Sequence, residues 1–369
     1  MNFLKFFDRN LMDWVTDKEL KDMFDIDNPS NIRDIITSMD TGSTINRRKL
    51  RKVVSETIST IEYPTSDTTE RGSYSTVYMN TSYNKKKSVV KVGELEGSTI
   101  DQYNQLCSLF FEAIITKIMF KISKEIPCFQ SPDIFKCGKS YGKTIIIMEQ
   151  LDAVPFSRVN EPVKAIKSLA NTLRILQDVV YFSHRDLHAN NCMWNGNVCI
   201  IDYGFACISM PPYNEMSVQD LFEYYSPKLE DNIYKNNMST SLKACENKSH
   251  DLCMIILSMN NIFVNDKINE WAKKISIGYM KEIREGYNKY TISRMIYDNK
   301  YRKGMREYFF PDVPNVIDYT YYFLRKPSGV KFESIMPYQW IYDMYEIELQ
   351  DFIPRVFLKD YELKPCLKF

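Results

Sequence analysis

Several features that would point to particular protein classes are missing from this sequence. The 369 residues carry 48 lysines and arginines against 47 aspartates and glutamates, so the net charge of +1 gives no general attraction to nucleic acid or to a membrane surface. No apolar run approaches the roughly 18 residues that a spanning helix needs, and the first residues are charged too early for a signal peptide. The sequence therefore predicts an intracellular, cytoplasmic protein that has no membrane span and binds no nucleic acid.

Paired cysteines are missing as well. The nine cysteines are scattered, their number is odd, and no C-x-x-C pair occurs, so neither a zinc ribbon nor a thioredoxin-like site is indicated. Reduced thiols in an intracellular compartment are expected. The chain does contain 44% hydrophobic and 14% aromatic residues, which is enough to bury a substantial core.

One stretch carries the chemistry. Residues 183–191 contain the pattern H-R-D-L-x-x-x-N, which is followed by an apolar strand and by Asp202-Tyr203-Gly204. Phosphoryl transfer from ATP requires one carboxylate that orients the attacking hydroxyl and accepts its proton, and further oxygen ligands that hold Mg²⁺ on the phosphates. Asp186, Asn191 and Asp202 supply these groups.

This combined pattern closely resembles the eukaryotic-type protein kinases. The resemblance implies that Asp186 is the catalytic base and that Asn191 and Asp202 hold Mg²⁺ or Mn²⁺. His188 stands where serine/threonine protein kinases usually carry a lysine that contacts the transferring phosphate. We expect His188 to replace that lysine in part as a phosphate or acceptor ligand; the alternative is that it merely fills the loop.

The preceding region resembles the first strands of the kinase small lobe. Of the three glycines usual in the loop that covers the phosphates, Gly72 alone is retained, and Val77 follows in its usual place. Lys91 ends an apolar strand where a kinase places its phosphate-binding lysine. Glu112 follows 21 residues later in an apolar helical stretch, where a carboxylate is costly unless it is paired, so we expect it to pair with Lys91.

The resemblance also implies an ATP site. Met148, Glu149 and Leu151 belong to the pattern M-E-x-L, which is typical of the hinge whose backbone binds adenine. Val77 and Val89 would cover the adenine ring from above, and Met193 would support it from below.

The expected fold is α+β and bilobal. Residues 1–62 are predicted to form an extra helical segment, with a capping box at Thr16 to Glu19. Residues 63–151 would form a small β-rich lobe that includes a helix over residues 101–124, and residues 152–369 a larger helical lobe with a C-terminal extension. Within the larger lobe, Asp251 would open a helix and brace the loop around Asp186.

The leading functional hypothesis is an ATP- and Mg²⁺-dependent serine/threonine-protein kinase that acts on protein substrates. The first alternative is a small-molecule phosphotransferase of the aminoglycoside-kinase type, because Asp186-Leu187-His188 is common in that group and residues 205–248 lack the kinase tripeptide A-P-E. Arg185 and the hinge pattern favour the protein kinase. The second alternative is a pseudokinase scaffold, in view of the glycine-poor loop. The composition resembles that of kinases from large DNA viruses, which would place the protein in host cytoplasm or the virion.

Overall fold

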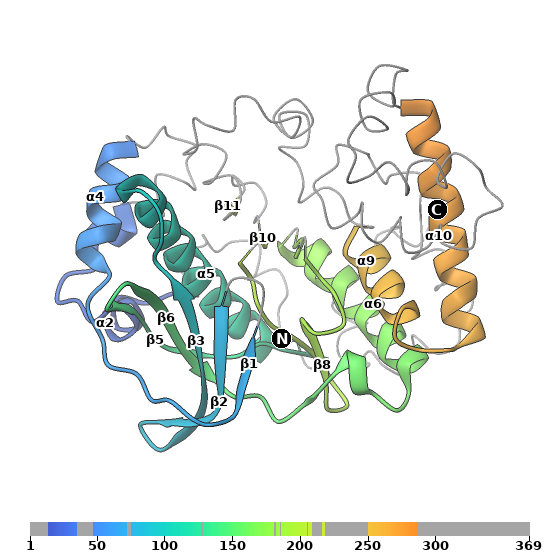
Figure 1. Cartoon of the computed structure of the whole chain (residues 1–369), viewed down its shortest axis with the longest axis horizontal. Coiled ribbons are helices and arrows are strands. Elements are labelled where there is room, and N and C mark those ends of the chain that lie inside the picture. The colour runs from blue at the N-terminus through green and yellow to red at the C-terminus, as the bar shows by residue number, and fades with distance from the viewer. Residues whose placement is uncertain are drawn as a thin grey trace. The chain divides into compact units, whose positions relative to one another are not determined.

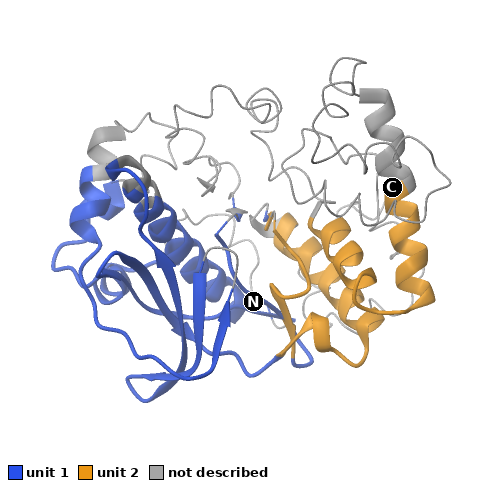
Figure 2. Ribbon diagram, in the orientation of Figure 1, with its two compact units in different colours: residues 1–153, 178–182, 195–227 blue, residues 154–177, 183–194, 228–369 orange. Residues whose placement is uncertain are grey.

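The structure is a computed structural model of the chain, and it describes residues 14–34, 47–71, 75–126, 128–180, 182–184, 186–204, 206–208, 216–217 and 250–286. The fold is mixed α+β (Figure 1). It divides into two compact units, which Figure 2 colours blue and orange. Unit 1 comprises residues 1–153, 178–182 and 195–227; unit 2 comprises residues 154–177, 183–194 and 228–369. None of the helices in the described ranges is long and apolar enough to cross a membrane.

A five-stranded antiparallel sheet forms the centre of unit 1. Its strand order is β1-β2-β3-β6-β5, and the strands are β1 (Thr69–Arg71), β2 (Ser75–Tyr83), β3 (Lys86–Glu94), β5 (Ile134–Ser140) and β6 (Lys143–Glu149). The β2–β3 connection is a two-residue turn at Asn84 and Lys85, both of which have positive φ. That conformation is what a tight hairpin with right-handed strand twist requires.

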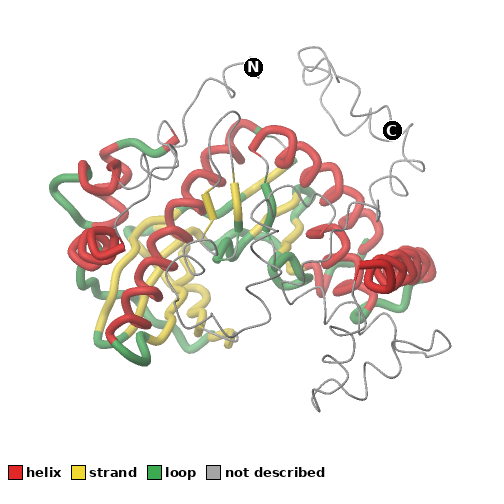
Figure 3. The backbone as a smooth tube through the Cα atoms, turned by 90° about the horizontal axis from the view of Figure 1, so that it is seen from above, coloured by secondary structure: helices red, strands yellow, loops and turns green. Residues whose placement is uncertain are grey.

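The long helix α5 (Thr99–Glu125) runs along one face of this sheet (Figure 3). Side chains alternate along β3, so Val89 and Lys91 share one face while Val90 and Val92 lie on the other. The register places Val77 and Ile146 on either side of Lys91.

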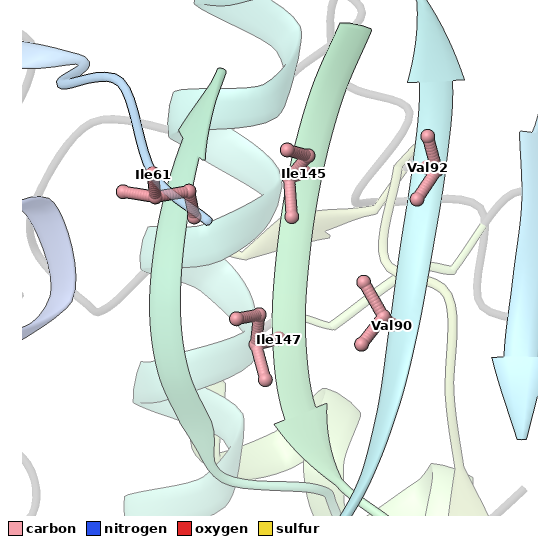
Figure 4. Packing of buried hydrophobic residues seen from close by; sticks show 5 residues of the cluster. All are labelled: Ile61, Val90, Val92, Ile145 and Ile147. Carbon is pink, nitrogen blue, oxygen red and sulfur yellow. The ribbon is translucent and has the colours of Figure 1, made fainter. Parts of the chain in front are cut away.

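The opposite face, called the outer face here, is contacted by an extended segment that follows α4 (Arg47–Thr57). Backbone hydrogen bonds of 3.0 Å join Ser59 and Ile61 to Lys139 at the edge strand β5. Ile61 then lies on the sheet and completes an apolar cluster (Figure 4), whose members are Ile61, Val90, Val92, Ile145 and Ile147. Gly138 makes this approach possible, since a Cβ there would lie 2.6 Å from the Ile61 side chain.

Strand β2 contains one irregularity. Tyr78 pairs with Val90, but Thr81 pairs with Ser88, so three steps on β2 correspond to two on β3. One extra residue is therefore inserted into β2, which defines a β-bulge. Asn80 sits in the bulge with a φ of 55°, in the left-handed region that asparagine tolerates better than most residues.

The described N-terminal elements belong to unit 1. They are α2 (Asp17–Phe24), a helical turn at residues 30–34, and α4 (Arg47–Thr57). The predicted capping box is confirmed, because the Thr16 hydroxyl accepts from the Glu19 amide while the Glu19 carboxylate accepts from the Thr16 amide. A short parallel pair, β4 (Phe129–Gln130) with β9 (Val198–Ile200), and the pair β10 (Cys207–Ile208) with β11 (Met216–Ser217) complete the unit.

Unit 2 is mainly helical. Its described elements are β7 (Val154–Pro155), the 3-10 turn η2 (Phe156–Arg158), most of α6 (Pro162–Val180), β8 (Cys192–Trp194), α9 (His250–Asn260) and α10 (Asp266–Gly286). The helix that Asp251 was expected to open is present as α9. The Trp271 side chain is buried, as are those of Ile268, Ala272 and Ile275 on α10.

Candidate functional site

Lys91 is the centre of the candidate site in unit 1. Its Nζ atom lies 2.7 Å from Glu112 Oε1 and 2.7 Å from Asp202 Oδ1. The contact between Lys91 and Glu112, expected from their spacing of 21 residues, is therefore present. Asp202 joins the same ammonium group, so residues far apart in the sequence meet at one point on the face of the sheet that α5 covers.

The burial of Lys91 and Glu112 explains why their charges are paired. The Glu112 side chain is about one-tenth exposed, and that of Lys91 is 18% exposed. Burial opposes a charged ammonium, and yet the carboxylates of Asp202 and Glu112 outweigh it, so the pKa of Lys91 lies above its ordinary value. Lys91 is therefore a permanent cation at physiological pH. A cation fixed between two carboxylates can offer its charge to a phosphate that enters beside it.

Asp202 follows β9 in a strained conformation. Its φ of 61° lies in the left-handed region, which costs a non-glycine residue about 1–2 kcal/mol. The next residue secures the turn, because the Tyr203 ring is buried and its hydroxyl lies 3.0 Å from both Ser131 Oγ and the Ile200 carbonyl. Strain of this kind tends to occur at functional sites, and Asp202 combines it with a partly exposed carboxylate.

Gly204 lies close to the carboxylates. A Cβ at this position would lie 3.4 Å from Asp202 Oδ1 and 3.5 Å from Glu112 Oε2. A side chain at this position would therefore be in van der Waals contact with both carboxylates, whereas glycine leaves them uncovered on this side.

The predicted hinge lies at the end of β6. Met148 is half-buried and pairs with Val89 on β3, while the Glu149 amide donates to the Asp133 carbonyl at 2.8 Å. Leu151 is half-buried just beyond the strand. Gln150, which the sequence did not single out, donates through Nε2 to Asn80 Oδ1 at 2.9 Å and accepts from the Asn80 amide at 2.8 Å.

The loop of residues 184–191 in unit 2 is called the catalytic loop here. Its backbone turns twice, with His188 N–H donating to the Asp186 carbonyl at 3.1 Å and Asn191 N–H to the His188 carbonyl at 2.8 Å. The Asn191 amide group donates through Nδ2 to the same Asp186 carbonyl at 2.9 Å. Because Nδ2 is used in this way, Oδ1 is the atom of Asn191 that could bind a metal ion.

His188 interacts with the catalytic loop through both ring nitrogens. Nδ1 accepts from the Asn190 amide at 3.2 Å, so the proton of the neutral ring is on Nε2. Nε2 lies 3.8 Å from Asp186 Oδ2. The imidazole therefore lies beside the predicted catalytic carboxylate.

Helix α9 supports the catalytic loop at two points. The buried Asp251 accepts from the His184 amide at 2.6 Å, which confirms the predicted contact between this aspartate and the loop. Ser258, seven residues further along the same helix, accepts from the Ala189 amide at 3.0 Å. Seven residues make about two turns, so both side chains lie on one face of α9.

The remaining predicted residues lie as follows. Val77 and Val89 are half-buried on β2 and β3, on the same face as Lys91, and Met193 is half-buried on β8 in unit 2, paired with Pro155. Gly72 and Arg185 lie outside the described residues.

Sequence reasoning missed three contributors: Ser258, Gln150 and Asn80. The pattern D-x-x-x-x-x-x-S on a helix carries no signal of its own, and neither does a glutamine inside a hinge. The asparagine in a strand was the one available clue, because asparagine is depleted in strands and favoured where φ is positive.

The chain matches no protein-family model, and no curated protein is significantly similar to it.

Proposed function

We propose that this chain is a protein kinase that transfers the γ-phosphate of ATP to serine and threonine hydroxyls of proteins. In this proposal residues 63–151 form the small lobe of a bilobal protein-kinase-like fold and residues 152–369 the large lobe. The observation that carries the proposal is the position of Lys91, which lies 2.7 Å from both Glu112 and Asp202. A random match to the sequence pattern would not be expected to bring these three residues together from a strand, a helix and a distant loop.

Lys91 would bind the α- and β-phosphates of ATP. Its charge is permanent, and its side chain is oriented by Glu112, so no reorganisation is needed when the nucleotide arrives. A preorganised positive charge of this kind stabilises the negative charge that develops on the phosphate oxygens in the transition state. Val77, Val89, Met148 and Met193 would surround the adenine ring, and the backbone of Glu149 and Leu151 would bind its edge.

Asn191 and Asp202 would hold a magnesium or manganese ion through their side-chain oxygens. Carboxylate and amide oxygens are the hard ligands that these ions prefer. The Asn191 amide nitrogen donates to the Asp186 carbonyl, so Oδ1 is the Asn191 atom that would bind the ion, and the Asp202 carboxylate would supply the other ligand. When bound, the metal would neutralise phosphate charge.

Asp186 would orient the acceptor hydroxyl and take its proton. The surrounding turn fixes the backbone of Asp186, because its carbonyl accepts from both the His188 amide and the Asn191 side chain. A carboxylate held in this way supplies the positioning on which phosphoryl transfer mainly depends.

The test is transfer of labelled phosphate from Mg-ATP by the full-length protein. Generic protein substrates, sugars and aminoglycosides are offered in separate reactions, and nucleotide binding is followed by thermal shift. We expect labelling of proteins by wild type, its loss in Asp186→Asn, and no change in Asp266→Asn, which removes an exposed carboxylate at the start of α10. If only small molecules were labelled, the protein would be a small-molecule phosphotransferase and the proposal would be wrong. If the protein bound nucleotide but transferred no phosphate, it would be a pseudokinase.

A further inference from the structure

One stripe of α5 faces the N-terminal helix α2. Phe110, Lys117 and Lys121 are spaced by seven and four residues, so they project from the same side of the helix. The ring of Phe24, the last residue of α2, stacks on Phe110 with centroids 4.9 Å apart, and both side chains are fully buried. α5 is apolar around most of its circumference, which is typical of a helix that is covered on more than one side.

An ionic contact lies beside the stacked rings. Glu19 Oε1 lies 2.5 Å from Lys121 Nζ and 3.8 Å from Lys117 Nζ. Lys117 is itself held by Asp133 at 2.6 Å. Glu19 therefore connects α2 to two lysines of α5, and the burial of Lys117 gives this contact more weight than an isolated surface ion pair would have.

Glu19 is held in a defined position by its own helix. Its carboxylate also accepts from the amide and the hydroxyl of Thr16, at 2.9 Å each, to close the capping box. The side chain is thus ordered before it meets the lysines, which reduces the entropy lost in forming the contact.

Glu112 lies on the other side of α5. It follows Phe110 by two residues, which turns it about 200° around the helix axis, away from the stripe that α2 covers. Within unit 1, α5 therefore contacts α2 at Phe110, Lys117 and Lys121 and the sheet where Glu112 meets Lys91, and α4 packs on α5 as well.

We propose that residues 14–34 are a built-in brace that ties α5 to the edge strand β5, on which α2 also packs, and so keeps Glu112 on Lys91. Glu19 and Phe24 are then positioning residues for the phosphate-binding lysine, and the importance of the brace for catalysis rests on the proposed kinase function. In the absence of this brace, α5 would keep its contact with α4 but lose the cover over Phe110 and the tie to β5. We expect the resulting shift of α5 to separate Glu112 from Lys91 without altering any group that contacts ATP.

The first test weakens the contact from the side of α5. Lys121→Glu places a second carboxylate beside Glu19, and adding Glu19→Gln removes that repulsion while retaining the capping box, because glutamine serves equally well at this position. Lys124→Glu is the matched control, since it makes the same charge change one turn away on α5, where the lysine lies over the Phe120 ring. Phe24→Leu tests the stacked rings with a substitution that keeps most of the apolar volume.

The readout is zero-length cross-linking with a water-soluble carbodiimide, which joins a lysine to a carboxylate that it contacts. Mass spectrometry of the full-length protein gives the ratio of Lys91–Glu112 to Lys91–Asp202 cross-links. We expect this ratio to fall about twofold to fivefold in Lys121→Glu, in keeping with the small energy of a partly exposed ion pair, and to fall in Phe24→Leu. It should return toward wild type in Lys121→Glu/Glu19→Gln and stay unchanged in Lys124→Glu.

A purely structural role for α2 would lower thermal stability without changing the ratio, because both cross-links share Lys91. Unchanged ratios in folded Lys121→Glu and Phe24→Leu would overturn the brace. This readout needs no activity, so it decides the brace even if wild type proves unable to bind ATP. If wild type binds ATP, the same variants should weaken ATP binding by a similar factor. In a Glu112→Gln background, Lys121→Glu should not weaken ATP binding further.

Discussion

Ser258 lies two turns beyond Asp251 on α9, and the two side chains accept hydrogen bonds from opposite parts of the catalytic loop, at Ala189 and His184. One rigid helix therefore sets the spacing between two backbone positions that flank Asp186. The loop has its own turns as well, but these fix its local curvature rather than its attachment to unit 2.

This attachment predicts that three substitutions, two of serine and one of aspartate, lower the free energy of unfolding by different amounts. Ser258→Ala leaves the buried Ala189 amide without its acceptor, and we expect the free energy of unfolding to fall by about 1–3 kcal/mol; Asp251→Ala removes a bond to a charged acceptor and should cost about as much or more. Ser276→Ala is the control, because its buried hydroxyl has no hydrogen-bond partner among the described residues. Urea denaturation measures all three, and equal losses for Ser258→Ala and Ser276→Ala would contradict the assignment.

His188 can be tested with a substitution that separates its two contacts. His188→Asn supplies a side-chain oxygen that can accept the amide of residue 190, as asparagine does in turns, but carries no group that can become a cation. We expect it to transfer phosphate as poorly as His188→Ala, whereas His188→Lys should retain activity and depend less on pH between about 6 and 8, since only histidine changes charge there. Wild-type rates and pH profiles for His188→Asn would mean that the ring merely fills the loop.

Glu19 gives a prediction about acid stability. Burial would raise the pKa of its carboxyl, but hydrogen bonds from Lys121 and Thr16 and the nearby charge of Lys117 outweigh it and lower the pKa below its ordinary value. The pKa is lower in the folded than in the unfolded chain, so the stabilisation is present above about pH 4.3 and is lost as the pH falls through the folded value. The difference in unfolding free energy between wild type and Glu19→Gln should therefore shrink on acidification, as urea denaturation at a series of pH values would show. A difference that stays constant as the pH falls would contradict this prediction.

The contact of Ile61 with Gly138 predicts a specific rescue. A methyl group on Gly138 would lie within 2.6–2.8 Å of three Ile61 side-chain carbons, and overpacking of this kind costs about 1–3 kcal/mol. Adding Ile61→Ala removes those carbons and should relieve the added cost of Gly138→Ala. Gly142→Ala is the comparison: no atom lies within 4 Å of its Cβ, but its φ of +76° strains any side chain, so Ile61→Ala should not rescue it. Additive losses in both pairs, measured by thermal unfolding, would argue against the close contact.

Local elements could be predicted from the sequence because short-range patterns determine them. The helix expected over residues 101–124 extends over Thr99–Glu125, and the capping box at Thr16 is present. The contact of Lys91 with Glu112 was predictable too, because a buried carboxylate in an apolar helix requires a cation.

The contacts that could not be predicted join segments far apart in the chain. Nothing in the sequence near Ile61 indicates that it covers the outer face of the sheet, and α2 carries no mark of its position on α5. A clue was available in α5 itself, where apolar residues on all sides imply two covered faces, but that pattern does not say which segment supplies the second cover. The same holds for Ser258, whose role depends on a loop that lies 69 residues earlier.

The bulge in β2 has a consequence for insertions and deletions. Tyr78 faces Val90 and Thr81 faces Ser88, and residues 88 and 90 lie on the same face of β3. A chain from which Asn80 was deleted could therefore pair β2 with β3 in an unbroken ladder, and no side chain would have to change face. What such a chain would lose is the pair of hydrogen bonds to Gln150, so the inserted residue ties the end of β6 to β2.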